Sequence, residues 1–219
     1  MEDRYRQYAS SLTAPTGHCT IPCRRSFAET KAALGAAVPL LDRTYHRHLD
    51  AGDLVAAGEA LRELPTLNRF GAQPRDFGPI LRATAAAGTT TSQGDETGGI
   101  NISSSNNPHP ANTTTIREAL QYEIGNPHKA AQMVRLRSQT ALYAPIRVAL
   151  LRGCLVSSST GEVVSDRVWF EYDRPSHTMG STGIKEVDEI AKGLDEALRG
   201  VLFRVAGLEM EDERFESKI

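Results

Sequence analysis

The chain has few cysteines, no long apolar run and no excess of charge of one sign, and each absence excludes a class of protein. The three cysteines, Cys19, Cys23 and Cys154, are an odd number for a disulfide framework. No stretch approaches the ~18 apolar residues of a membrane span, so we expect no membrane partner. The 25 basic and 27 acidic residues give a net charge of −2, which provides no field to attract nucleic acid.

The common catalytic and cofactor-binding motifs are also absent. The sequence has no GxSxG elbow, phosphate-binding loop, dinucleotide glycine fingerprint or HExxH pair. This absence removes the easily recognised hydrolases and nucleotide-binding enzymes as first hypotheses, and we expect no cofactor. Residues 1–10 are polar and charged, unlike a signal peptide, so we expect a cytoplasmic protein.

The first part of the chain predicts an edge strand followed by a capped helix. Cys19, Ile21 and Cys23 alternate with less apolar neighbours, as in a strand with one apolar face. Because Pro22 cannot donate to a β-ladder, this strand should lie at a sheet edge. The segment Ser26-Phe27-Ala28-Glu29 has the spacing of a capping box and predicts the start of a helix.

Two helices and a connector are predicted next. The helix that starts at Ser26 should bury Leu34 and Val38 on one stripe. A second helix is predicted over 53–64, because an aspartate precedes it and a proline follows it. The connector at 45–48, with one tyrosine and two histidines, is charged and is expected to be exposed.

The segment from Gly88 to Thr115 consists of Thr, Ser, Asn, Gly and Pro with hardly any large apolar residue. Such a segment cannot bury enough surface to offset its ordering entropy, so we interpret it as a long polar insertion loop. We expect a loose leader at 1–15, one domain over 16–205 interrupted by this insertion at 88–115, and an acidic tail at 206–219.

Beyond the insertion the pattern predicts a strand followed by a capped helix. Leu120, Tyr122 and Ile124 alternate with polar residues, as in a half-buried strand. Asn126 is a good N-cap and Pro127 suits the first helical position, so a helix should begin there.

The last third of the chain predicts two strands and the longest helix. Strands are expected over 146–151 and 163–172, and the turn residues between them favour an antiparallel hairpin. Apolar residues over 184–205 recur with a clean helical period. The mixture predicts an α+β fold, with a small mixed or antiparallel sheet and helices packed on one of its faces.

Three linked segments carry a resemblance to a known family. They are Tyr122-Glu123-Ile124-Gly125-Asn126-Pro127, Leu142-Tyr143-Ala144-Pro145-Ile146-Arg147-Val148 and Phe170-Glu171-Tyr172-Asp173-Arg174-Pro175. In order and spacing they resemble the family catalogued as domain of unknown function 302, whose opening helix is similar to the one predicted at Ser26. The resemblance covers about residues 16–205 apart from the insertion. It implies a compact α+β fold and a homodimer, and it implies no activity.

The sequence departs from the family pattern at two positions. Many members carry Asp-His where this chain has Asp76-Phe77, and some carry Cys where it has Gly125. Any chemistry that those residues perform in relatives is therefore not expected here.

The N-terminal cysteines do not predict a metal site. Sulfur and imidazole ligands suit zinc, but Cys19 and Cys23 on one strand would lie about 13 Å apart at ~3.3 Å per residue. His18 would face the other side of the sheet. Core-facing thiols are the better interpretation.

The predicted helix start at Asn126 is the first candidate site. Free N–H groups and partial positive charge at a helix N-terminus favour an anion, and His128 and Lys129 fall in this first turn. Together with Arg147 and Tyr172 in the sheet, they could hold a carboxylate or a phosphate. The alternative is that the Asn-Pro pair only caps the helix, with both basic side chains in solvent.

A second candidate groups Tyr143, Arg147, Glu171 and Tyr172 on neighbouring strands. A carboxylate, a guanidinium and two phenols suffice for proton transfer if they converge in an apolar pocket. The catalytic candidates are then Glu171 or His128, with Tyr143. Strand alternation puts Glu171 opposite Tyr172, so a surface salt bridge between Arg147 and Glu171 is the simpler alternative.

Three hypotheses about function remain open. The first is a homodimer that binds a small anionic or aromatic organic ligand. The second is a cofactor-independent enzyme, an isomerase, lyase or cyclase, that uses the same pocket. The third is a protein-interaction module that uses the polar loop or the acidic tail. An open cleft with Arg and amide groups favours binding, a closed apolar pocket around one titratable group favours the enzyme, and an outward apolar patch favours the module.

Overall fold

The structure is a computed structural model that describes residues 17–88, 100–102, 112–157, 163–180 and 182–208. The predicted leader at 1–15 and most of the predicted acidic tail lie outside these residues. So does most of the predicted insertion. In the described part of the chain, every helix is too short or too polar to cross a membrane.

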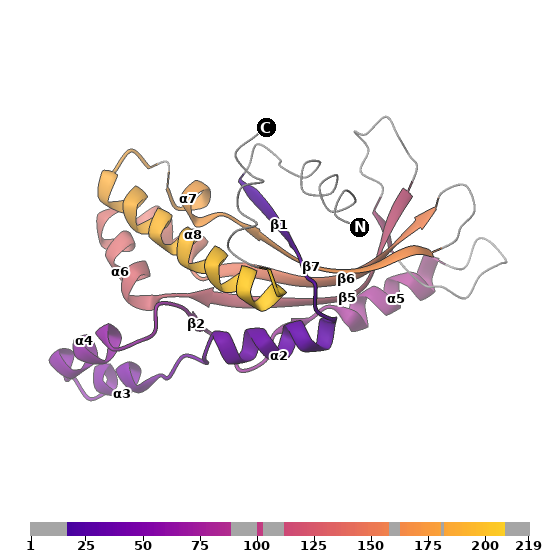
Figure 1. The fold of residues 1–219 in the computed structure, drawn as a ribbon. Coiled ribbons are helices and arrows are strands. Elements are labelled where there is room, and N and C mark those ends of the chain that lie inside the picture. Colours follow the sequence, from indigo (N-terminus) through magenta and orange to yellow (C-terminus); the bar gives the residue numbers. More distant parts are fainter. Residues whose placement is uncertain (1–16, 89–99, 103–111, 158–162, 181, 209–219) are drawn as a thin grey trace.

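The fold is built on one antiparallel sheet with strand order β1-β7-β6-β5-β2 (Figure 1). Two more short strands, β3 and β4, pair with β5. The strands are β1 (His18–Pro22), β2 (Asn68–Arg69), β3 (Arg75–Asp76), β4 (Ile100–Ile102), β5 (Asn112–Gly125), β6 (Ile146–Ser157) and β7 (Val163–Asp173).

Helices occupy the connections between these strands and the C-terminal part of the described chain. They are α2 (Phe27–Ala37), α3 (Thr44–Asp50), α4 (Leu54–Arg62), α5 (Gly78–Gly88), α6 (Pro127–Leu136), the 3₁₀ helix η2 (Ser138–Tyr143), α7 (Pro175–Thr178) and α8 (Lys185–Ala206). The predicted α+β class is therefore confirmed.

The predicted edge strand is confirmed at β1. It pairs only with β7, from His18 opposite Asp173 to Pro22 opposite Trp169. Its other edge has no strand partner in the described residues, as the missing N–H of Pro22 requires. Ile21 and Cys23 are buried on the face that packs against the helices.

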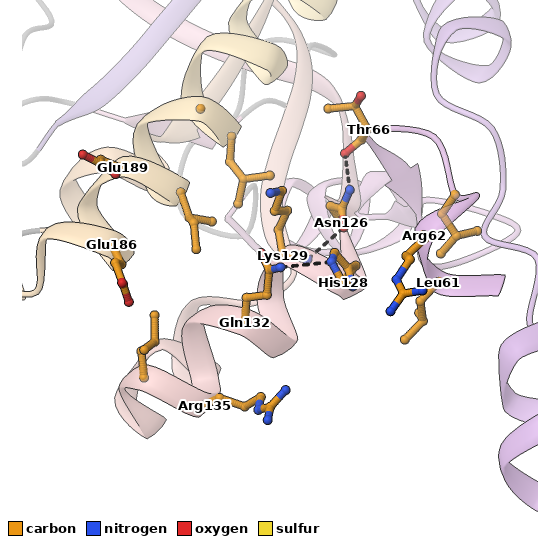
Figure 2. A pocket seen from close by; sticks show the side chains of 15 residues that line it. Leu61, Arg62, Thr66, Asn126, His128, Lys129, Gln132, Arg135, Glu186 and Glu189 are labelled. Carbon is orange, nitrogen blue, oxygen red and sulfur yellow. Dashed lines mark hydrogen bonds between the residues drawn. The ribbon is translucent and has the colours of Figure 1, made fainter. Parts of the chain in front are cut away.

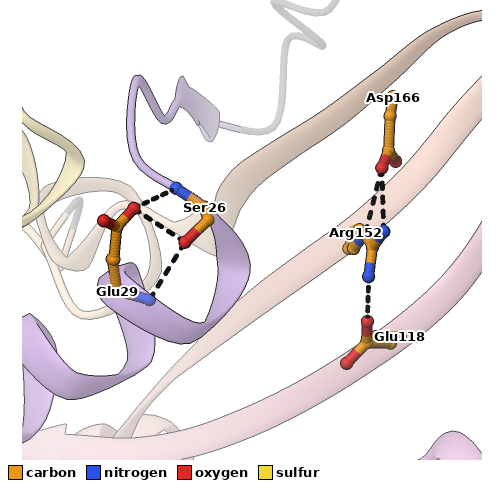
Figure 3. A network of polar contacts seen from close by, with 5 residues as sticks. All are labelled: Ser26, Glu29, Glu118, Arg152 and Asp166. Atoms are coloured by element: carbon orange, nitrogen blue, oxygen red, sulfur yellow. Dashed lines mark hydrogen bonds and ion pairs between the residues drawn. The ribbon is translucent and has the colours of Figure 1, made fainter.

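The predicted capping box at the start of α2 is also confirmed (Figure 3). The Glu29 amide donates to Ser26 Oγ at 3.3 Å, and the Ser26 amide donates to Glu29 Oε2 at 2.9 Å. Reciprocal bonds of this kind satisfy donors that the first helical turn leaves without partners. The helix then buries Leu34 and Val38 completely.

One hydrophobic core lies between a single sheet face and the helices α2, α6 and α8. The sheet supplies alternate residues such as Tyr122, Val148 and Phe170, whose exposure is 4% or less. Helix α8 supplies a stripe that repeats every three or four residues and is buried throughout: Val187, Ala191, Leu194, Leu198, Leu202 and Val205. Each large side chain buried in this way contributes about 1.5–3 kcal/mol.

Three sequence expectations differ from the structure. The connector at 45–48 lies in helix α3, where Tyr45 is buried, whereas His46 is exposed as expected and His48 is partly buried. Strands β4 and the first residues of β5 fall inside the range 88–115 that was interpreted as a loop. Strand β6 is also longer than predicted, and it runs to Ser157 with one register shift against β5 and one against β7.

Candidate functional site

The start of α6 is fixed by Asn126, the residue between β5 and the helix. Its Oδ1 accepts from the amide of Lys129 at 2.9 Å, and its Nδ2 donates to the carbonyl of Thr66 at 3.1 Å. Pro127 takes the first helical position, as predicted. Asn126 therefore caps α6 and also ties it to the segment that follows α4.

A groove with a volume of about 990 Å³ opens beside this helix start, between α4, α6 and α8 (Figure 2). Its apolar part comes from leucines of α4 and its C-terminal extension and from side chains of α6 and α8. The polar and charged part comes mainly from α6. The lining residues are Leu61, Arg62, Leu64, Thr66, Asn126, His128, Lys129, Gln132, Arg135, Leu136, Glu186, Glu189, Ile190, Gly193 and Leu194.

Basic side chains dominate the α4 and α6 sides of the groove. Arg62, Lys129 and Arg135 are exposed, and none of them forms an ion pair within the described part of the chain. His128 lies between them, with Nε2 3.0 Å from Nε2 of Gln132. A ligand on this side of the groove would therefore meet cationic donors that are not ion-paired within the described residues, while the carboxylates of Glu186 and Glu189 lie on the α8 side.

The backbone of α6 contributes less to anion binding than its side chains do. Pro127 has no N–H group, the Lys129 amide donates to Asn126 Oδ1, and the Ala130 amide donates to the Asn126 carbonyl at 2.9 Å. Among the first-turn donors described, the His128 amide is left for a ligand. The cap itself thus uses most of the donors that a helix N-terminus offers.

The structure brings together three of the five predicted ligand-binding residues. Asn126, His128 and Lys129 line the groove, but Arg147 and Tyr172 do not. Arg147 is exposed on the sheet face opposite the core, where its Cα pairs with Glu123. Tyr172 is 2% exposed in the core, and burial raises the pKa of its hydroxyl well above the usual range.

The catalytic candidates are dispersed over the molecule. Tyr143 is exposed at the end of η2. Glu171 lies on the outward sheet face, where Trp169 Nε1 donates to its Oε1 at 2.7 Å and His18 Nε2 lies 3.9 Å from its Oε2. Within the described residues Glu171 has no ion pair with Arg147, so the expected salt bridge between these two side chains is absent.

Sequence reasoning missed a buried polar cluster at the end of β7. Asp195 of α8 is 2% exposed, and its Oδ2 accepts from Arg174 Nε at 2.8 Å and from Ser176 Oγ at 2.6 Å. The hydroxyl of Tyr172 and the second oxygen of Asp195 are buried with no hydrogen-bond partner in the described residues. The sequence held one signal for this cluster, because Asp195 falls among the apolar residues that α8 buries.

A second cavity of about 540 Å³ lies at the start of α2. Beside it, Arg152 Nη1 donates to Glu118 Oε1 at 2.7 Å and Arg152 Nη2 donates to Asp166 Oδ2 at 2.9 Å (Figure 3). These three side chains come from β5, β6 and β7 and neutralise one another in part. Arg152 is therefore committed to its two carboxylates and is not available to an added anion.

The three cysteines form no disulfide within the described residues. Cys154 and Cys23 are buried, and Cys19 is partly buried opposite Tyr172 in the register of β1 and β7. Burial raises the pKa of the Cys23 thiol to about 12. No group of three or more possible metal ligands occurs among the residues that the structure describes.

Comparison with known proteins gives a likeness in structure but none in sequence. No family model matches the chain, and no curated protein matches it. The crystal structure of an uncharacterized conserved protein DUF302 from Bacillus stearothermophilus is 12% identical, with a TM-score of 0.48. The match covers 86% of this chain and 98% of that chain.

Proposed function

We propose that this chain binds a small organic anion with an apolar part in the groove between α4, α6 and α8, and that it does so as a homodimer. The observation that supports this most strongly is that Arg62, Lys129 and Arg135 line the α4 and α6 sides of one groove and form no ion pair within the described residues. The leucines that line the same groove suit an aliphatic or aromatic body.

The shape of the groove favours binding over catalysis. A general acid or base normally sits in a water-excluded site, where burial shifts its pKa toward the working pH. The cationic side chains of this groove are exposed, and neither Glu171 nor Tyr143 lines it. An enzyme that used this pocket would have to rely on His128, which is partly buried, or on the exposed carboxylates of Glu186 and Glu189.

A titration of the labelled protein with simple anions tests the proposal. Caproate and benzoate carry a carboxylate on an aliphatic and an aromatic body, and amide resonances of His128 and Lys129 should shift on addition of either. The double variant Arg62→Ala, Lys129→Ala should weaken binding about tenfold, since each exposed ion pair contributes up to ~1 kcal/mol.

Lys192→Ala is the matched control for that experiment. Lys192 is an exposed lysine of α8 that does not line the groove. Its removal changes the net charge by one unit and should leave the affinity for caproate unchanged. The double variant removes two charges, so a loss of binding free energy in the control half as large as in the double variant would mean that only the overall charge attracts the anion, and the groove would then not be the site.

A second candidate function is a protein-interaction module, favoured by the exposed apolar residues of the α3–α4 hairpin. Leu54 and Val55 are 72% and 73% exposed, and Leu49 on α3 is 43% exposed. Neighbouring exposed apolar side chains of this kind often mark a contact surface. Sedimentation velocity of Leu54→Ser, Val55→Ser tests this surface, because loss of a dimer would place the contact there. An unchanged dimer would place the contact elsewhere.

A further inference from the structure

The groove between α4, α6 and α8 has two walls of opposite charge. Arg62 and Lys129 come from α4 and α6, and Glu186 and Glu189 come from α8 (Figure 2). Leucine and isoleucine side chains of the three helices, including Leu61 and Ile190, also line the groove. The groove therefore has basic side chains on its α4 and α6 sides and acidic side chains on its α8 side.

The two walls do not neutralise one another. Arg62 and Lys129 make no ion pair in the described chain, and Glu186 makes none either. Glu189 lies 3.7 Å from Lys185 one turn away on α8, and both of these side chains are largely exposed. Such an exposed pair contributes little and leaves the carboxylate available to another cation.

We infer that the ligand of this groove is a zwitterion, an aminoalkyl carboxylate or a related compound with an anionic end, an apolar middle and a cationic end. This inference rests on the proposed function, because it takes the anionic end to lie against α4 and α6. The cationic end then lies against the carboxylates of α8. A simple anion would use only half of the groove and would be repelled by the other half.

Glu186 and Glu189 differ in whether a role other than ligand binding accounts for their negative charge. Glu186 lies in the first turn of α8, where a negative charge also interacts favourably with the helix dipole. Glu189 lies one turn further on and has no such role, since the effect falls off within the first turn. A variant at Glu189 therefore tests the contact with the cationic end of the ligand without also changing the interaction with the helix dipole.

The test compares pairs of probes that differ only in an amino group. Butyrate is compared with γ-aminobutyrate and caproate with ε-aminocaproate, so that two separations of the charges are sampled. Each compound is titrated into the full chain, and the affinity is taken from the shifts of amide resonances. We expect one of the amino compounds to bind about threefold more tightly than its partner, as one exposed ion pair allows.

The variants Glu189→Gln and Glu196→Gln assign that advantage to the groove. Glu196 is an exposed residue of α8 that does not line the groove, so it is the matched control. Glu189→Gln should remove the preference for the amino compound and leave caproate binding equal or slightly stronger. Glu196→Gln should leave the preference intact.

The possible outcomes separate the two proposals. If caproate binds at the groove and neither amino compound is preferred, the zwitterion inference is overturned and the proposed anion binding stands. A preference that survives Glu189→Gln also overturns the inference, because the second charge is then held elsewhere. If no probe shifts the resonances of α6 at millimolar concentration, both the anion proposal and the inference fail.

Discussion

Arg174 Nε lies 2.8 Å from Oδ2 of Asp195, and this contact joins the end of β7 to the middle of α8. The Asp195 side chain is 3% exposed, whereas that of Arg174 is 33% exposed. The ion pair is therefore buried on one side and reaches solvent on the other. It adds a polar contact between the longest helix and the end of β7 to the apolar packing of the neighbouring Leu194 and Leu198.

Removal of the cation from this pair should destabilise the fold. Arg174→Ala leaves a buried carboxylate with Ser176 as its remaining described partner, and we expect a loss of about 2–4 kcal/mol in the free energy of unfolding. Urea denaturation followed by circular dichroism measures it. Arg152→Ala is the control, because its two ion pairs are half exposed and should contribute about 0–1 kcal/mol. Similar losses in both variants would contradict a special role for the Asp195 contact.

Gly153 should not tolerate even one added methyl group. A Cβ at this position would lie 2.7 Å from the carbonyl oxygen of Thr115 and 3.0 Å from the Trp169 ring, where β5 and β6 change register. Gly153→Ala is expected to lower the free energy of unfolding by about 1–3 kcal/mol. Thermal unfolding checks this value.

The matched control for that substitution is Gly200→Ala in α8. No atom lies within 4 Å of a Cβ added at Gly200, and alanine is the better helix former by about 1 kcal/mol. The two substitutions should therefore have opposite signs. Destabilisation by both would mean that this part of α8 packs more tightly than its contacts indicate.

The capping box should make stability depend on acid pH. Hydrogen bonds from Ser26 lower the pKa of Glu29 below its ordinary value, so the ionised form is favoured by folding. A lowered folded-state pKa contributes stability above the unfolded-state value of about 4.3, and this contribution is lost as the pH falls through the folded-state pKa. The difference in unfolding free energy between the natural chain and Glu29→Gln should therefore shrink between neutral pH and pH ~3. A difference that is constant over this range would show that the charge of Glu29 has no part in the cap.

The three thiols should differ strongly in reactivity. Burial raises the pKa of Cys23 to about 12, and Cys154 is 2% exposed, so both should resist alkylation in the folded chain. Cys19 is the partly exposed thiol among the three. Iodoacetamide labelling at pH 8 with peptide mapping should modify Cys19 first and Cys23 only on unfolding. Equal labelling of Cys19 and Cys23 in the folded chain would contradict the burial of Cys23.

Local sequence signals predicted a structural feature correctly where the residues involved form that feature through their own hydrogen bonds or lack of a donor. Ser26 with Glu29 and Asn126 with Pro127 each specify a helix start through their own hydrogen bonds, and both were predicted correctly. Pro22 predicted the edge of the sheet for the same reason. The period of α8 was clear because a long helix averages over many positions.

Other features could not be predicted because their causes lie far away in the sequence. Helix α3 is short and mostly polar or charged, so no clear apolar period marks it in the sequence. Its buried residue, Tyr45, is evident only in the structure. The threonines at the start of β5 have the composition of a loop, but they pair with β6 across a register shift. Of the predicted site residues, those of α6 share a groove because they are adjacent in sequence. Arg147 and Tyr172 were assigned to it without knowledge of which sheet face each occupies.

The strand order β1-β7-β6-β5 has a consequence for biosynthesis. His18 and Asp173, paired at one end of β1, are 155 residues apart in the chain, whereas β6 and β7 are neighbours in it. A ribosome therefore releases β1 long before its partner exists, and contacts of such long range form late and slowly. The nascent chain must carry this strand unpaired until nearly the whole sheet has been translated. Pro22 then has a second use, because a strand that lacks an N–H group is a poor template for premature pairing with another nascent chain.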